Sequence, residues 1–312
     1  MNTKVSIAYL AGLALLVAAP TVIYPVLVMK VLCFALFACA FNLLLGYTGL
    51  LSFGHAIFLG TSAYVAGYVI KVLEFGPLAG IAVGTVAAGA LGWVIGSLAI
   101  RRQGIYFAMI TLALAQLMYF IYVQAPFTGG EDGLQGIARG SMFGIDLTND
   151  LALYYVVVGF FAAAFWLIQR TIHSPFGQTL KAIRENEQRT ISLGYDVDRY
   201  KLLAFVLSAA IAGLAGALKA LLFGFATLGD IHWHTSGEVV LMTLLGGMGT
   251  VFGPVVGATV IVTLQTELSD KVGSLVSVIM GCIFVFCVLV FRRGIVGEGV
   301  ALYKRMIGEK VH

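Results

Sequence analysis

The stretch that decides the fold is VVLMTLLGGMGTVFGPVVGATVIVTLQTEL, from Val239 to Leu268. It is apolar almost throughout, and it is longer than the ~20 residues that one helix needs to cross a bilayer. Four glycines and a proline interrupt it: Gly246, Gly247, Gly249, Gly253 and Pro254. Because glycine and proline weaken the interior of a helix, the stretch predicts a hairpin of a short helix and a longer one.

The composition of the whole chain places this hairpin in a membrane. Of the 312 residues, 60% are hydrophobic and only 11% are charged, and the mean hydropathy is +0.98. Soluble domains carry roughly 25% charged residues. The apolar segments are near ~20 residues long and lack the ~10-residue alternation of a membrane β-barrel. We therefore predict an all-α integral membrane protein, with residues 1–312 forming a single transmembrane domain.

Nine apolar segments follow one another along the chain: 5–24, 26–45, 50–70, 78–100, 105–124, 151–170, 201–226, 239–267 and 274–291. The first has a basic start and small residues before Pro20, which is typical of either a secretory signal or an uncleaved first span. We expect the uncleaved span.

Basic residues assign the sides of the membrane. They gather at 101–102, between 170 and 201, and after 291, so these regions are expected in the cytoplasm. The loop 125–150 holds one basic residue against four acidic ones, and it is expected on the outer, periplasmic side. An even number of crossings must then follow residue 201, which requires the hairpin. This gives about ten transmembrane or half-spanning helices with both termini cytoplasmic; eight or nine full spans with re-entrant pieces fit nearly as well.

A second glycine-rich run, GYTGLLSFGHAIFLGTS at 46–62, opens the third apolar segment. Its GYTG resembles the GGMG at 246–249, and interrupted segments in the two halves of a transporter point to its binding site. We expect both runs at the translocation path or gate. The residues concerned are Gly46, Gly49, Ser52, Gly54, His55, Gly246, Gly247, Gly249, Gly253 and Pro254. His55 is interpreted either as a packing histidine or as a residue of the path.

Charged side chains are nearly missing from the spans. Lys30 lies near a boundary, and Lys219 is close enough to the outer end to extend its ammonium group to the headgroups. Ion-coupled carriers keep an acidic residue in the membrane, so the energy source is expected elsewhere. The chain has no phosphate-binding loop, nucleophile elbow or metal-ligand motif. We expect a non-catalytic subunit without cofactor, metal or nucleic acid.

The loop 171–200 carries the clearest signals of folded structure outside the membrane. Ser174 and Pro175 are typical of the start of a helix, and Gly194 is typical of a helix end. One helix or two short ones are therefore predicted between them.

An apolar stripe runs along this predicted helix. Phe176, Leu180 and Ile183 fall at i, i+4 and i+7, so they share one helical face. Such a stripe either lies on the lipid surface or docks into a groove on a partner. The ATPase that this chain lacks is the partner we expect.

Five stretches, taken in order, carry a family resemblance. They are GYTGLLSFGHAIFLGTSAY, GIYFAMITLALAQ, TGGEDGL, AIRENEQRTISLGYDVDRYKLLAFVLSAAIAGLAGAL and LLGGMGTVFGPVVGA. Together they resemble the M-type (LivM-like) permease subunits of branched-chain amino-acid ABC importers, over roughly Leu36 to Phe291. The resemblance implies a type II importer-like fold in the bacterial inner membrane. The implied partners are a second, H-type permease subunit, two cytoplasmic ATPases that bind ATP and magnesium, and a periplasmic solute-binding protein.

The resemblance also implies contacts with those partners. The residues expected to dock the ATPase are Phe176, Leu180, Ile183, Arg184, Glu185, Glu187 and Gly194. Arg189 and Thr190 depart from the alanines that are usual in the family's loop. Glu131 and Asp132 of the outer loop are expected to contact the binding protein.

The expected cargo is a branched-chain or related amino acid. Urea and aromatic carboxylates, which members of this family also carry, are alternatives within the same role. A self-sufficient channel or facilitator for a small solute, with the two glycine-rich runs as re-entrant pore loops, is the alternative from another class.

Overall fold

The structure is a computed structural model that describes residues 9, 12, 14–21, 23–142, 144–290 and 294–298. Within these residues, five helices are long and apolar enough to cross a membrane. They are α2 (Pro25–Thr48), α4 (Pro77–Ala99), α5 (Ile105–Gln124), α6 (Asp150–His173) and α9 (Val197–Phe223). The predicted all-α membrane fold is confirmed. The two chain termini, predicted to be cytoplasmic, lie outside the described residues.

Other helices complete the membrane part and the loop between α6 and α9. The apolar ones are α3 (Ala56–Lys71), α10 (Trp233–Gly246), α11 (Gly253–Val272) and α12 (Val276–Val290). The loop holds α7 (Pro175–Glu185) and α8 (Glu187–Ser192). With 16 residues, α3 rises about 24 Å, which is less than the ~30 Å hydrocarbon core. This helix therefore needs the irregular residues before it to complete a crossing.

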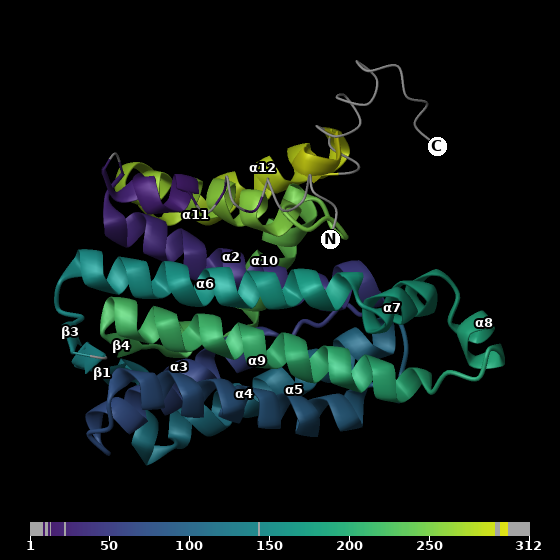
Figure 1. Ribbon diagram of the computed structural model, residues 1–312, viewed down its shortest axis with the longest axis horizontal. Coiled ribbons are helices and arrows are strands. Elements are labelled where there is room, and N and C mark those ends of the chain that lie inside the picture. Colours follow the sequence, from purple (N-terminus) through teal and green to yellow (C-terminus); the bar gives the residue numbers. More distant parts are fainter. Residues whose placement is uncertain are drawn as a thin grey trace.

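The helices run roughly side by side, with α2 inside the bundle (Figure 1). Helix α2 packs against α6, α9 and α11, while α9 also packs against α3 and α4. Large side chains fill this core, among them Phe37, Phe41, Tyr64 and Phe205, all 0% exposed. In contrast, α5 leaves Ile105, Tyr106 and other apolar side chains exposed on one face.

The predicted hairpin is confirmed. Its short arm α10 has 14 residues and its long arm α11 has 20. The arms cross closely, because a Cβ on Gly246 would lie 1.9 Å from the carbonyl oxygen of Gly253. A Cβ on Gly257 would lie 1.8 Å from the carbonyl oxygen of Met242. Only glycine permits either approach, which explains two of the glycines in this run.

Short strands close the end of the bundle opposite to α7 and α8 (Figure 1). The strand β1 (Leu134–Gln135) pairs antiparallel with β4 (Phe225–Ala226), and β2 (Ser141–Met142) pairs with β3 (Ile145–Asp146). Three 3-10 turns lie next to β1 and β4 in the chain: η2 (Pro126–Thr128), η3 (Gly130–Asp132) and η4 (Leu228–Asp230). Elsewhere, η1 (Ala19–Thr21) precedes α2, and η5 (Gly273–Leu275) joins α11 to α12. The predicted outer loop is thus folded onto the end of α9.

Candidate translocation and coupling site

The glycine-rich run at 46–62 is a break between two helices. Helix α2 ends at Thr48, and Gly49 follows in the left-handed conformation with φ +79°, its amide bonded to the Leu44 carbonyl. Residues 50–55 are not helical, and α3 begins at Ala56. A non-helical backbone at membrane depth is stable only if its polar groups find partners within the protein.

Side chains of other helices supply those partners. The amide of Phe53 donates to Thr111 Oγ1 of α5 at 3.3 Å, and the amide of Ala56 donates to Ser236 Oγ of α10 at 2.9 Å. Within the break, the Gly54 amide donates to Ser52 Oγ at 3.4 Å. The break is therefore a fixed part of the core, joined to α5 and α10.

His55 lies just before α3 in a closed aromatic cage. It is 0% exposed, and the rings of Phe37, Phe41, Phe58 and Phe205 surround it at centroid distances between 5.3 and 6.4 Å. Its Nε2 is 3.0 Å from Ser208 Oγ of α9. Because the Ser208 hydroxyl donates to the Ala40 carbonyl, it accepts from an Nε2–H. In this conformation His55 packs helices together and does not line an open path.

The two glycine-rich runs touch each other. A Cβ on Gly46 would lie 2.6 Å from the amide nitrogen of Gly249, so only glycine at 46 permits the approach. Asn42 of α2 fixes the contact: its Oδ1 accepts from the Gly249 amide and its Nδ2 donates to the Thr250 carbonyl, each at 2.9 Å. The α2 break and the hairpin turn thus form one junction.

The loop between α6 and α9 is folded as two capped helices. The Ser174 hydroxyl accepts from the Gly177 amide at 3.3 Å, and Asn186 caps α8 through the Arg189 amide at 3.0 Å. Gly194 has φ +88°. The predicted helix start and the left-handed glycine at the helix end are both confirmed.

The apolar stripe in this loop does not face a partner, which corrects our expectation. Leu180 and Ile183 are only 0% and 3% exposed, and they pack with Val197 and Ala204 of α9. Phe176 stacks on the Tyr200 ring at 5.5 Å. Helical periodicity identified the apolar face correctly, but that face is covered by α9 of the same chain.

Glu187 also acts inside the chain. Its Oε1 accepts from Lys201 Nζ of α9 at 2.6 Å and from Gln103 Nε2, before α5, at 2.8 Å. The ammonium of Lys201 is almost fully buried, so this ion pair joins α8 to α9 and to the α4–α5 turn. Glu185 is exposed, and Arg184 is exposed as a residue although its guanidinium donates to the Gly46 carbonyl.

The comparisons with known proteins agree with this architecture. A sequence profile of the family described as "Branched-chain amino acid transport system / permease component" matches residues 25–289. The chain belongs to this family.

Its relatives include permease proteins of high-affinity branched-chain amino acid transport. The LivM proteins of Salmonella typhimurium and Escherichia coli are 28% and 27% identical, over 73% of this chain and 60% of each relative. The LivH protein of Escherichia coli is 24% identical over 85% of this chain and 91% of its own. The chain spans about 60% of the length of the LivM relatives. No solved structure matches it.

Lys219 of this permease does not extend to the headgroups, contrary to expectation. Its ammonium pairs with the carboxylate of Asp230 in η4, and the two side chains are 14% and 7% exposed. The ammonium also lies over the Phe34 and Phe223 rings, 5.6 and 6.0 Å from their centroids. Asp230 lies outside the apolar segments of the sequence, but the fold places its carboxylate against the ammonium of Lys219.

The residues expected to contact a binding protein lie far from the junction of the permease. Glu131 and Asp132 are exposed in η3, at the end of the bundle that also holds the short strands. Their position leaves both carboxylates accessible on the predicted outer side.

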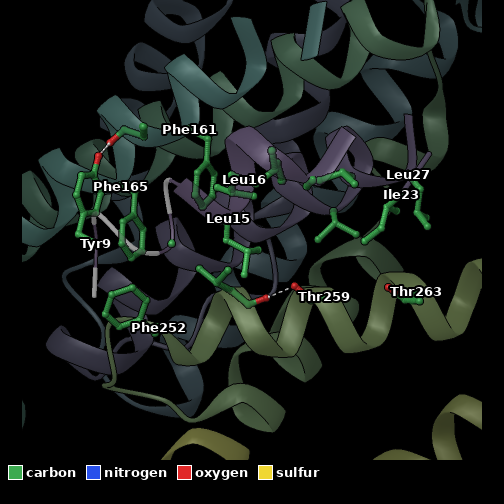
Figure 2. A pocket seen from close by; sticks show the side chains of 17 residues that line it. Tyr9, Leu15, Leu16, Ile23, Leu27, Phe161, Phe165, Phe252, Thr259 and Thr263 are labelled. Atoms are coloured by element: carbon green, nitrogen blue, oxygen red, sulfur yellow. Dashed lines mark hydrogen bonds between the residues drawn. The ribbon is translucent and has the colours of Figure 1, made fainter. Parts of the chain in front are cut away.

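A cavity of about 510 Å³ lies elsewhere in the permease, between the N-terminal residues, α2, α6 and α11. Figure 2 shows that most of its labelled lining is apolar, including Leu15, Phe165 and Phe252, and that the hydroxyl-bearing residues labelled there are Tyr9, Thr259 and Thr263. The Tyr9 hydroxyl donates to the Ala162 carbonyl, and Thr259 donates to Val255. Such a cavity has the lining expected for a hydrocarbon ligand. It does not offer the polar groups that would orient an amino acid.

The sequence analysis missed three residues that hold the junction together. Asn42 joins the two runs, and Thr111 and Ser236 satisfy amides of the break. Asn42 carries a usable signal, because a lone amide side chain inside an apolar span needs a hydrogen-bonding partner. Thr111 and Ser236 carry no such signal, since hydroxyl groups in a helix commonly bond to their own backbone.

Proposed function

We propose that this permease is one of two membrane subunits of an ATP-driven importer in a bacterial inner membrane. It forms half of the translocation path for branched-chain or related amino acids, which a periplasmic binding protein delivers. The α7–α8 loop is the observation that carries the proposal. It is rigidly joined to α9 by Glu187 and Lys201, in a chain without a nucleotide-binding motif of its own.

A separate ATPase docks on this loop through a different surface from the stripe. Ile191, Leu193 and Tyr195 are 47%, 68% and 44% exposed, and we call these three residues the docking surface. Grouped apolar side chains on a soluble loop indicate a contact with another protein. The exposed Arg184 and Glu185 flank this part of the loop in sequence. Two such ATPases, each binding ATP and magnesium, serve this chain and a second, H-type permease subunit.

The proposed topology has about ten crossings with cytoplasmic termini. Helices α9, α10, α11 and α12 supply the even number of crossings that the basic residues require after 201. A Cβ on Gly294 would lie 2.4 Å from the Gly247 backbone, so the chain returns after α12 to the turn of the hairpin. That turn lies on the α7 side of the bundle, the side proposed to face the cytoplasm.

Transport follows from the rigidity of these connections. ATP binding in the partner subunits moves the α7–α8 loop, and the ion pair at Lys201 transmits that movement to α9. Packed helices switch between discrete arrangements and do not deform continuously, so the two breaks are the places where α2, α3 and the hairpin change direction. The path then opens alternately to each side.

A self-sufficient channel is not favoured by the same geometry. The glycine runs pack against each other, and side chains of the protein satisfy their amides. Related permeases are named for autoinducer 2 and for L-arabinose, so relatives of this fold carry different cargo, and urea or an aromatic carboxylate are the alternatives to an amino acid.

Reconstitution tests the proposal. The chain is placed in proteoliposomes with an H-type permease, both ATPases and a binding protein, and uptake of labelled leucine, urea and benzoate is measured. We expect uptake of one of them that requires ATP and the binding protein. Uptake by the chain alone, without nucleotide, would establish a channel instead.

A further inference from the structure

We propose that Arg184 is the positioning residue that transmits movement of the α7–α8 loop to both glycine breaks. This inference rests on the proposed function and adds a route for the coupling. Arg184 lies in the last turn of α7, and its guanidinium donates a hydrogen bond to the carbonyl of Gly46. It is thus an exposed residue of the cytoplasmic loop whose end reaches the junction.

The carbonyl that Arg184 binds is one that the helix itself leaves free. Gly46 lies in the last turn of α2, which ends at Thr48. The last four carbonyls of a helix have no intrahelical partner, and a positive charge there is also favourable for the helix dipole. The amides of Gly49 and Leu50 both return to Leu44. Arg184 therefore completes the end of α2 from a separate element.

Two glycines, Gly49 and Gly249, leave room for this side chain and a third, Gly46, supplies its acceptor; we call the three the glycine socket. A Cβ on Gly49 would lie 3.3 Å from Arg184 Cγ, and a Cβ on Gly249 would lie 3.1 Å from its Nη1. The aliphatic part of the Arg184 side chain thus lies against Gly49 at the end of α2, and its guanidinium lies against Gly249 of the hairpin turn. A side chain at Gly49 or Gly249 would narrow the space that Arg184 occupies.

The socket belongs to both breaks at once. Gly46 and Gly49 end α2, while Gly249 is in the turn of the hairpin and is held by Asn42. A displacement of α7 therefore pulls on the ends of three membrane helices through a single guanidinium. A second contact supports the same attachment, since Lys181 Nζ lies over the Tyr47 ring, 5.7 Å from its centroid.

The experiment uses the reconstituted complex with three variants. Arg184→Ala removes the contact, and Arg184→Lys keeps a charge and a donor but loses the planar fork of the guanidinium. Arg102→Ala removes an exposed positive charge at the α4–α5 turn and serves as the matched control. Retention of the ATPases, the rate of ATP hydrolysis and the uptake per ATP hydrolysed are measured for each.

We expect Arg184→Ala to retain its ATPases and to hydrolyse ATP, while uptake per ATP falls about tenfold, the scale of one charge-assisted hydrogen bond. Arg184→Lys should recover part of that loss, and Arg102→Ala should match the unmodified complex. A merely structural cap would lower hydrolysis and uptake together and leave their ratio unchanged.

Three results would overturn the inference. Unchanged uptake per ATP in Arg184→Ala would show that the contact transmits nothing, and a parallel fall of hydrolysis and uptake would make it a structural cap. Loss of the ATPases from Arg184→Ala would make Arg184 a docking residue. Failure of the unmodified complex to import with ATP would instead overturn the proposed function, so the two proposals fail on different samples.

Discussion

Asn42 of α2 accepts a hydrogen bond from the amide of Gly249 at 2.9 Å, although 207 residues separate them in the sequence. The same side chain donates to the Thr250 carbonyl. One amide group therefore satisfies a donor and an acceptor of the hairpin turn, at the point where α10 and α11 leave their backbone unpaired.

Replacing Asn42 by leucine should destabilise the permease. The two side chains have the same number of heavy atoms and both branch at Cγ, so the main effect is an unsatisfied amide and carbonyl, at about 1–3 kcal/mol for each buried group. The bulkier methyl groups of leucine add to this loss. The midpoint of unfolding in detergent, followed by circular dichroism, measures it. An unchanged midpoint would mean that water or lipid headgroups satisfy the turn.

Gly46→Ala should disrupt the junction by sterics alone. The added Cβ would lie 2.2 Å from Asn42 Oδ1 and 2.6 Å from the Gly249 amide nitrogen, so the hairpin must shift away from α2. Gly159→Ala on α6 is the matched control, because a Cβ there meets no atom within 4 Å. We expect a lower melting temperature and lost uptake only for Gly46→Ala. Equal behaviour of the two variants would contradict the close packing.

His55→Ala should lower the stability of the protein without lowering the uptake per ATP hydrolysed. The change empties a cage formed by four phenylalanines and removes the bond to Ser208, and cavities of this kind cost about 2–5 kcal/mol. Uptake per ATP, measured on the fraction of protein that stays assembled, should remain within about twofold. A selective loss of uptake per ATP would indicate that His55 is a residue of the translocation path.

The docking surface and the buried stripe should respond differently to the same substitution. Leu193→Asp places a carboxylate on an exposed position and should release the ATPases from an otherwise stable membrane subunit. Leu180→Asp buries a charge against α9, which is costly without a partner, and should prevent folding of the loop. Co-purification of the ATPases and the yield of folded permease distinguish the two. Retention of the ATPases by Leu193→Asp would place docking elsewhere.

Lys219 and Asp230 should behave as one unit. Removing one member of a buried ion pair costs about 3–5 kcal/mol, whereas replacing both is often close to neutral. Lys219→Met should therefore lower the melting temperature more than Lys219→Met combined with Asp230→Asn. Asparagine at 230 keeps an acceptor for the Thr227 amide, which the carboxylate now binds. Additive losses in the double variant would show that the two charges act independently.

Sequence reasoning was most successful for local structure. The all-α membrane class, the hairpin with its short arm, the Ser174 cap and the left-handed Gly194 all follow from residues close together in the chain. Hydrophobic length, glycine and proline, and short polar side chains set these features through backbone geometry and solvation. The family was also visible in five motifs, and the profile match over residues 25–289 confirms it.

The partners of individual side chains were decided only by the tertiary structure. The stripe of Leu180 and Ile183 was correctly assigned to one helical face, but its cover turned out to be α9 and not an ATPase. Lys219 was predicted to lie at the end of a span with its ammonium in the headgroups, but in the structure it pairs with Asp230 of η4.

The physical reason is the same in each case. Periodicity and composition report which surfaces avoid water or lipid, because that preference is a property of the residues themselves. They do not report which segment meets that surface. The sequence by itself therefore determined a helical membrane permease with two glycine breaks, and only the packing of distant helices brought those breaks together around Asn42 and Arg184.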